Sequence, residues 1–245
     1  MSSSLPRRAL LGIATATALV GCAATKTVVL DRQAAAGIKR IGLPTVGMPK
    51  SPDVTVINTA SKQMAGFGLI GAIGALSGSI VRGNRSDSLV RMMAAQNFDP
   101  GPAFNALLVT DLQAKGFEVV PIPINPRRAF LPTAPSSPAY DAVLDCYVFQ
   151  YGFTALDDSD SSPYRATVIV PVRLVGGSGA VLMEDTVVIS GSGVPTPATA
   201  TAGPTEPTPV AFTSFSDAEK DPATAVNALR SAFELAATGI VRRAS

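Results

Sequence analysis

Hydrophobic and polar residues alternate along the middle of the chain in a pattern typical of β-strands. In residues 165–175, apolar side chains occupy every second position, at Val168, Val170, Val172 and Leu174. This period of two predicts a strand with one buried face and one partly wet face. Residues 141–153 and 180–190 have a related pattern, and Gly176-Gly177-Ser178-Gly179 predicts a tight turn before the last segment. We therefore expect an antiparallel meander of three strands.

Two other segments repeat apolar residues at helical spacing. One follows Asp99-Pro100 and continues to Gly116, and the other follows Asp221-Pro222. Asp is a favoured N-cap, Pro is favoured in the first helical turn, and Gly ends helices. The apolar positions are Phe104, Leu107, Leu108 and Leu112 in the first segment and Val226, Leu229, Phe233, Ala236 and Ile240 in the second. A shorter helix is predicted to begin at Ser86 or Ser88 and to continue through Asn97.

The remaining segments complete the predicted fold. Ile- and Val-rich runs at 38–45, 54–58 and 117–121 predict short strands. Residues 122–139 are rich in Pro and predict an extended loop, and a Pro- and Thr-rich stretch at about 191–213 predicts a flexible segment. Together these elements predict a single α+β domain, with a mixed or antiparallel sheet and helices packed on one face.

The beginning of the chain has the features of an export signal. Arg7 and Arg8 precede an uncharged apolar run, residues 9–20, that is too short to span a bilayer as a helix. The run ends in Leu19-Val20-Gly21-Cys22, which closely resembles the lipobox of bacterial lipoproteins. In that family the cysteine thiol receives a diacylglyceryl group and the signal is cut before it. The resemblance implies that Cys22 is the lipidated first residue of the mature chain, and the alternative is an ordinary signal with a coincidental cysteine.

This resemblance divides the chain and places it in the cell. Residues 1–21 are then a removed signal peptide, residues 22–36 a lipidated tether and residues 37–245 the domain. Two or three acyl chains hold a protein on a membrane essentially permanently, at about 0.8 kcal/mol per buried CH₂. In many Gram-negative lipoproteins an Asp after the cysteine marks inner-membrane retention, so Ala23 implies the outer membrane, with the domain facing the periplasm. Arg7-Arg8-Ala9-Leu10-Leu11 resembles a twin-arginine export motif, and Sec export stays open as the other route.

Residues 64–81 are uncharged and rich in glycine. The glycines are Gly66, Gly68, Gly71, Gly74 and Gly78. In a helix, Gly71, Gly74 and Gly78 would lie opposite a stripe of Leu and Ile, so that another backbone could approach closely, as between membrane helices. The stretch resembles the glycine-zipper segments of some outer-membrane lipoproteins. Three alternatives stay open: an element buried in the domain, a membrane-inserted or self-associating element, and a loop.

The composition narrows the classes of function. The chain contains no His, which excludes Ser-His-Asp and Cys-His catalytic units and the commoner zinc sites. Only Cys22 and Cys146 are present, so no intramolecular disulfide can form once Cys22 is lipidated. Without Arg7 and Arg8, the 20 basic residues fall to 18 and match the 18 acidic ones. A neutral mature chain argues against a nucleic-acid partner.

The other candidate clusters are predicted to be structural. Arg127-Arg128 could grip a phosphate or a carboxylate, but two solvated arginines on a loop are the favoured interpretation. The acidic run at 157–162 lacks the Gly and the Glu of an EF-hand loop and predicts a solvated turn. Cys146 and the pair Met92-Met93 are predicted to be core residues.

The sequence therefore predicts no catalytic residue, no cofactor and no metal site. The expected function is that of a non-enzymatic cell-envelope lipoprotein that binds or scaffolds other envelope components. The alternative is a subunit of an oligomeric secretion channel or transport accessory complex, which would use residues 64–81. The expected partners are the membrane, through the lipid on Cys22, and a second copy or another envelope protein. A hydrolase is disfavoured because no nucleophile and base can be paired by spacing.

The order of the predicted elements also resembles two families of envelope proteins. These are the amino-terminal α/β domain of periplasmic TolB-like proteins and the periplasmic part of the curli secretion channel lipoproteins. The resemblance concerns architecture alone and implies no functional residue.

Overall fold

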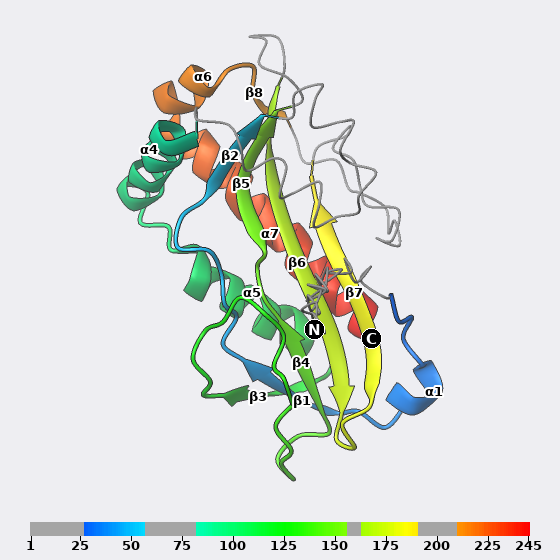
Figure 1. The fold of residues 1–245 in the computed structure, drawn as a ribbon. Coiled ribbons are helices and arrows are strands. Elements are labelled where there is room, and N and C mark those ends of the chain that lie inside the picture. The colour runs from blue at the N-terminus through cyan, green and yellow to red at the C-terminus, as the bar shows by residue number, and fades with distance from the viewer. Residues whose placement is uncertain (1–26, 57–81, 156–162, 191–209) are drawn as a thin grey trace, which may run out of the picture.

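The computed structural model describes residues 27–56, 82–155, 163–190 and 210–245 (Figure 1). Cys22, the glycine-rich stretch 64–81, the acidic run 157–162 and most of the predicted flexible segment lie outside the described residues.

A mixed sheet forms the centre of the molecule. Its strands are β1 (Arg40–Pro44), β2 (Asp53–Val56), β3 (Glu118–Ile122), β4 (Ala142–Cys146), β5 (Gln150–Ala155), β6 (Tyr164–Gly176), β7 (Val181–Ile189) and β8 (Val210–Phe212). β1 pairs in parallel with β3 and β4, and β2 pairs in parallel with β5. β4 and β5 both pair antiparallel with β6, and so do β7 and β8. The long strand β6 therefore connects the parallel and antiparallel parts of the sheet.

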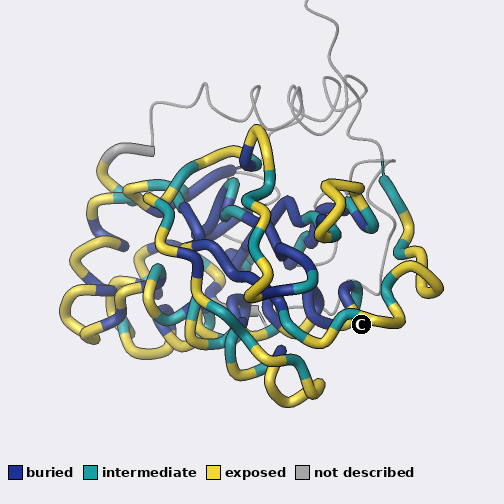
Figure 2. Tube along the Cα trace, turned by 90° about the horizontal axis from the view of Figure 1, so that it is seen from below, coloured by how far each residue is buried: buried dark blue, intermediate teal, exposed yellow. Residues whose placement is uncertain are grey.

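Helices cover one face of this sheet. They are α4 (Arg82–Ala95), α5 (Pro100–Ala114), α6 (Phe215–Lys220) and α7 (Pro222–Ala244), and a short helix α1 (Arg32–Ala35) lies outside this layer. α7 crosses behind β6 and β7, with α5 and α4 beside it (Figure 1). The buried residues gather between the two layers (Figure 2). This arrangement confirms a single α+β domain with helices packed on one face.

The predicted helix signals act as expected. Asp99 accepts a hydrogen bond from the Gly101 amide at the start of α5, and Asp221 accepts one from the Thr224 amide at the start of α7. Gly116 follows α5 with a φ of +88°, a conformation that glycine adopts without steric cost. α4 begins earlier than predicted, at residue 82, and Ser88 is not its cap. Ser88 is instead buried inside the helix, where its hydroxyl donates to Glu219 of α6 at 2.6 Å.

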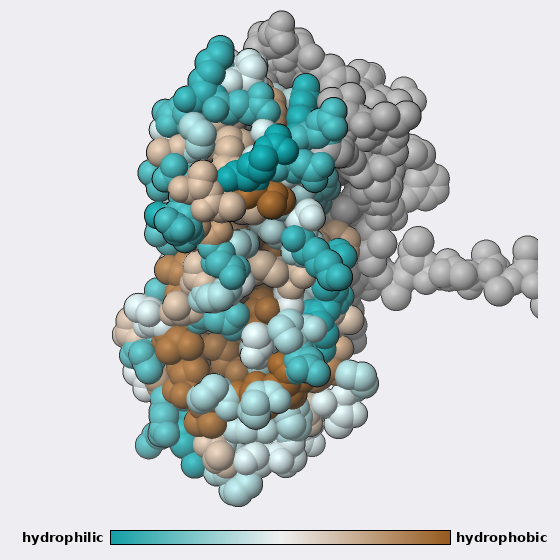
Figure 3. Space-filling model, turned by 90° about the vertical axis from the view of Figure 1, so that its left-hand side faces the viewer, coloured by the Kyte–Doolittle hydropathy of each residue, from teal (hydrophilic) through white to brown (hydrophobic). Residues whose placement is uncertain are grey.

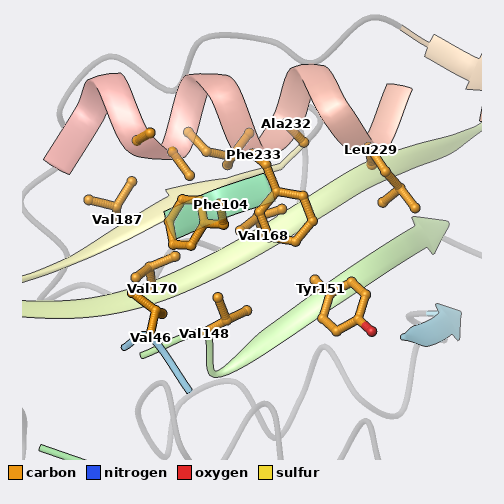
Figure 4. Packing of buried hydrophobic residues seen from close by; sticks show 14 of the residues in the cluster. Val46, Phe104, Val148, Tyr151, Val168, Val170, Val187, Leu229, Ala232 and Phe233 are labelled. Atoms are coloured by element: carbon orange, nitrogen blue, oxygen red, sulfur yellow. The ribbon is translucent and has the colours of Figure 1, made fainter. Parts of the chain in front are cut away.

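Aromatic rings meet at the centre of the core. Phe233 of α7 is 1% exposed and lies 5.4 Å from the Phe104 ring of α5 and 5.7 Å from the Tyr151 ring of β5, measured between centroids. A third ring, Phe98, lies 6.2 Å away, from the link between α4 and α5. Figure 4 shows Phe233 above β6, close to Val168. One side chain therefore joins two helices, the link between α4 and α5, and the sheet.

The predicted strand at 141–153 is interrupted, which is a correction. β4 ends at Cys146 and β5 begins at Gln150. Up to Val148, the even-numbered side chains face the helices and join the main core. From Tyr151 onward, the odd-numbered side chains join the same core. An extra residue in a strand shifts every later side chain to the other face. If the alternation of residues 141–148 is extended to residues 149–153, it therefore assigns those side chains to the wrong face of the sheet.

Three other segments differ from the sequence-based expectations. The face of β6 that was predicted to be partly exposed to solvent is also buried, at Thr167, Ile169 and Val175. The predicted flexible segment ends before β8, since residues 210–212 pair with β6. Within the predicted tether, Val28 already pairs antiparallel with Glu184 of β7. The attachment of the chain to the domain thus begins before residue 36.

Gly152 provides a test of the close approach between β2 and β5. Its φ is +142°, and a Cβ atom at this position would lie 1.9 Å from the carbonyl oxygen of Asp53. We expect Gly152→Ala to lower the free energy of unfolding by about 2–4 kcal/mol, through backbone strain and overlap. Gly101→Ala is the control, because the nearest atom to its added Cβ would be 3.6 Å away. Urea unfolding of both variants should show a large loss for Gly152→Ala alone, and equal midpoints would contradict this account.

Candidate functional site

An apolar groove opens where the end of α4 and the start of α5 meet the sheet. Its volume is about 960 Å³, and apolar side chains form most of its wall, including Leu43, Val46, Met48, Val90, Phe98 and Val119. Figure 3 shows hydrophobic residues gathered on the face of the molecule that carries α4, α5 and β3. We call this feature the Tyr151 groove, after one of the polar residues in its wall. Its size lies within the range of ligand pockets, roughly 300–1,000 Å³.

Tyr151 places a hydroxyl in the wall of this groove. The side chain is 3% exposed and its ring packs on Phe233. Figure 4 shows the hydroxyl on the side of the ring away from α7. Among the described residues no group forms a hydrogen bond with it. Burial, together with the nearby negative charge of Asp99, raises the pKa of Tyr151 to about 12. At neutral pH the hydroxyl is therefore protonated and can donate a hydrogen bond to a bound molecule.

Asn105 and the start of α5 bring polar groups to the groove that already have partners, and Lys50 adds an exposed positive charge to the wall. Asn105 accepts from the Val46 amide at 3.2 Å and donates to the Gly101 carbonyl at 3.0 Å, so it ties α5 to the segment between β1 and β2. The start of α5 offers no free amide for an anion, because Pro100 and Pro102 have no N–H and the Gly101 and Ala103 amides donate to Asp99. Although a helix N-terminus often binds anions, this one is fully occupied.

The edge of the sheet beside the groove is poorly suited to pairing with another strand. β3 has five residues, and in the part of the chain that the structure describes it pairs with β1 alone. Pro121 removes one amide from the strand, and Glu118 adds an exposed charge. Short edge strands with Pro and charged residues are typical of edges protected against strand addition. The concave groove is therefore a better binding surface than the strand edge beside it.

A buried ion-pair cluster lies on the opposite face of the sheet and corrects one prediction. Arg127 is not solvated: its Nη2 donates to Oδ1 of Asp145, whose side chain is fully buried. Arg173 donates to the other carboxylate oxygen at 3.0 Å, and the Leu131 amide donates to the same oxygen at 2.7 Å. Arg128 is exposed, as predicted. Arg127 thus does grip a carboxylate, but one that belongs to its own chain.

The cluster fastens the loop at 123–141 across the sheet. Arg173 also donates to the Leu131 carbonyl, and its guanidinium lies 4.6 Å from the centroid of the Phe130 ring. At Gly47 the loop backbone comes so close that an added Cβ would lie 1.7 Å from the Arg127 carbonyl oxygen. Because both carboxylate oxygens have partners, we assign the cluster a structural role.

Of the candidate residues singled out from the sequence, Met93 lines the groove and the others do not come together there. Cys22, Gly66, Gly68, Gly71, Gly74 and Gly78 all lie outside the described residues. Cys146, Met92 and Met93 are buried in the core, which confirms their predicted role. Across the described ranges, no group of three or more acidic or thiol side chains is placed to hold a metal ion. In the same ranges, no helix has both the length and the apolar character needed to cross a membrane.

Sequence reasoning missed the Tyr151 groove. Tyr151 was part of a predicted strand, and the shift of faces after Val148 turns its ring toward the helices. One feature of the sequence could have indicated the groove. The start of α5 is rich in Pro and contains Gly101, so its side chains are small and fill little of the space beside the sheet.

The buried thiol and phenol make the stability depend on pH in the alkaline range. Burial raises the pKa of Cys146 from 9.0 to about 12, as it does for Tyr151 from 10.0 to about 12. Both groups ionise more readily in the unfolded chain, so stability is complete below pH 9 and falls between about pH 9 and pH 12. In Cys146→Ala we expect a smaller fall between pH 9 and pH 10, measured by urea unfolding at each pH. An equally steep fall in both proteins would contradict the assignment to the thiol.

Comparison of the chain with protein-family models, with curated protein sequences and with solved structures finds no match.

Proposed function

We propose that this protein is a lipid-anchored cell-envelope module that binds an apolar ligand or an apolar segment of a partner in the Tyr151 groove, without catalysis. The lipobox at Leu19-Val20-Gly21-Cys22 supports the anchor, and Ala23 supports the outer membrane. One observation carries the binding role: an apolar groove of about 960 Å³ whose wall includes the hydroxyl-bearing side chain of Tyr151.

The groove favours a particular ligand chemistry. The apolar part of a ligand would be removed from water by the side chains of the wall. This burial stabilises the complex by roughly 25 cal/mol per Å² of apolar surface. A single acceptor, such as a carbonyl or an ether oxygen, would satisfy Tyr151. Asp99 stands close enough to influence Tyr151 and disfavours an anionic group beside the hydroxyl, and Lys50 balances this negative charge elsewhere in the wall. A neutral amphipathic molecule or peptide segment fits these requirements.

The probe for this proposal is prodan, a neutral naphthyl ketone whose fluorescence depends on polarity and hydrogen bonding. We expect saturable binding to the lipidated protein in mild detergent, and Tyr151→Phe should weaken it roughly 2- to 10-fold, the value of one hydrogen bond. Ala94→Trp should block binding because Ala94 lines the groove, whereas Ala95→Trp, an exposed neighbour outside the groove, should not. Equal binding by the two tryptophan variants would rule out the groove as the site.

The second candidate function is a subunit of an oligomeric secretion channel or transport accessory complex. The glycine spacing in residues 64–81 favours it, because small residues allow close packing between helices. Light-scattering chromatography of the full lipidated protein in detergent tests it beside Gly74→Leu/Gly78→Leu. A defined oligomer that the substitutions dissociate without unfolding would support this function, and a monomer in both cases would exclude it.

A further inference from the structure

The start of the described chain lies on the sheet edge formed by β7. The Val28 amide donates to the Glu184 carbonyl at 2.8 Å, and the Glu184 amide donates back to Val28 at 2.9 Å. Three residues later, the Asp31 amide donates to the Leu182 carbonyl at 3.3 Å, and α1 begins. This segment is therefore fixed to the domain and is not a free linker.

Only a short length of chain separates this attachment from Cys22. Val28 lies six residues after Cys22, and six extended residues span at most about 22 Å. A lipid on Cys22 would therefore hold the β7 edge close to the membrane surface. A domain on a long linker could turn freely, but this one cannot turn its opposite side to the membrane without releasing Val28.

Exposed hydrophobic side chains are concentrated at the same edge. In the described ranges, three large hydrophobic residues are exposed: Val29 at 78%, Val181 at 40% and Val90 at 38%. Val29 follows the paired Val28, and Val181 is the first residue of β7, beside the Asp31–Leu182 hydrogen bond. Two of the three thus lie at the attachment of the N-terminal segment, while Val90 lies on α4.

Basic residues flank this edge. Arg32 of α1 is exposed, and so is Arg242 near the end of α7, whereas the exposed Asp31 carboxylate accepts hydrogen bonds from the Gln33 and Ala34 amides at the start of α1. The end of α7 is held beside β7, because Arg243 donates to Asp185 at 2.6 Å. Figure 1 shows the C-terminus on the same side of the molecule as α1. Exposed apolar side chains on the same side of a molecule as basic ones are typical of surfaces that rest on anionic phospholipid.

We infer that the edge formed by residues 28–32 and the start of β7 is a membrane-contact surface, which sets the orientation of the domain on a phospholipid bilayer. The inference rests on the proposed lipidation of Cys22. Val29 and Val181 enter the interfacial layer, and Arg32 and Arg242 face the lipid headgroups. The Tyr151 groove, whose wall includes Val90 of α4, then stays open to the aqueous side.

The test uses the full lipidated protein in vesicles of phosphatidylethanolamine and phosphatidylglycerol, with a single fluorescent label on an added cysteine. Val29→Cys and Val181→Cys report on the proposed surface, and Gln113→Cys, at an exposed position of α5 outside the groove, is the control. Cys146 does not compete for the label because it is buried and its pKa is raised to about 12. Spin-labelled phospholipid should quench the labels at positions 29 and 181 at least about threefold more than the label at 113, as expected for interfacial contact.

The outcomes separate the surface from the anchor. Equal quenching at all three positions in protein that floats with the vesicles overturns the contact surface and leaves the anchor intact. Protein that does not float, or whose flotation persists after Cys22→Ser, overturns the lipid anchor and with it the surface. Circular dichroism of each labelled variant checks that the fold is retained.

Discussion

Asp145→Asn should lower the free energy of unfolding by about 3–5 kcal/mol, because it leaves two partly buried arginines without their counter-ion. The Asp145 side chain is fully buried, and the Arg127 and Arg173 side chains are 19% and 16% exposed. Removing one member of a buried ion pair costs much more than the pair itself contributes, since the remaining charge stays desolvated. Urea unfolding of the purified variant measures the loss.

A combined variant separates charge from packing. Asp145→Leu/Arg127→Met/Arg173→Met replaces the whole cluster with apolar side chains and should recover part of the lost stability, because no charge stays buried but the Leu131 amide and carbonyl lose their partners. Hydrogen exchange supplies a local readout, because the Leu131 amide donates to Asp145 and should exchange faster in Asp145→Asn. A loss below about 1 kcal/mol for Asp145→Asn would show that the cluster is hydrated like an exposed pair.

Phe233→Ala should also destabilise the protein, by about 3–5 kcal/mol. The ring is almost completely buried and contacts Phe98, Phe104 and Tyr151. Its removal takes away apolar contact and leaves a cavity between α7 and the sheet. Thermal or urea unfolding measures this loss, and the exposed residue Asn227 on the same helix provides the control.

This substitution should change the groove as well as the stability. Phe98 and Tyr151 both line the groove and both pack on Phe233, so they lose their support together. We expect weaker binding of prodan by Phe233→Ala than by Asn227→Ala at a temperature where both are folded. If Phe233→Ala unfolds at the same urea concentration as Asn227→Ala, the ring is not the centre of the core.

The parts of the fold that depend on local chemistry could be predicted from the sequence. Asp99-Pro100 and Asp221-Pro222 start helices because their side chains and fixed φ angles act within one turn. The alternation of apolar residues in β6 and the glycine-rich turn before β7 could also be predicted, because strand periodicity and turn conformation are local properties.

The parts that depend on distant partners could not be predicted. Arg127 finds a counter-ion 18 residues away, and Val28 finds its strand partner 156 residues away, at Glu184. The change of face between Val148 and Tyr151 depends on how β4 and β5 fit against β6, and a pattern of apolar residues does not record it. The groove follows from that change, so the candidate site became visible only with the tertiary structure.

The anchor on Cys22 is the claim on which the proposed function depends most, and the intact mass of the mature protein tests it directly. The account predicts a chain that begins at Cys22 and carries the added mass of a diacylglyceryl group, with or without a further acyl chain on its amino group. The Cys22→Ser protein should lack this mass and should leave the membrane fraction. A mature chain with an unmodified Cys22, or one cut at another residue, would contradict the account.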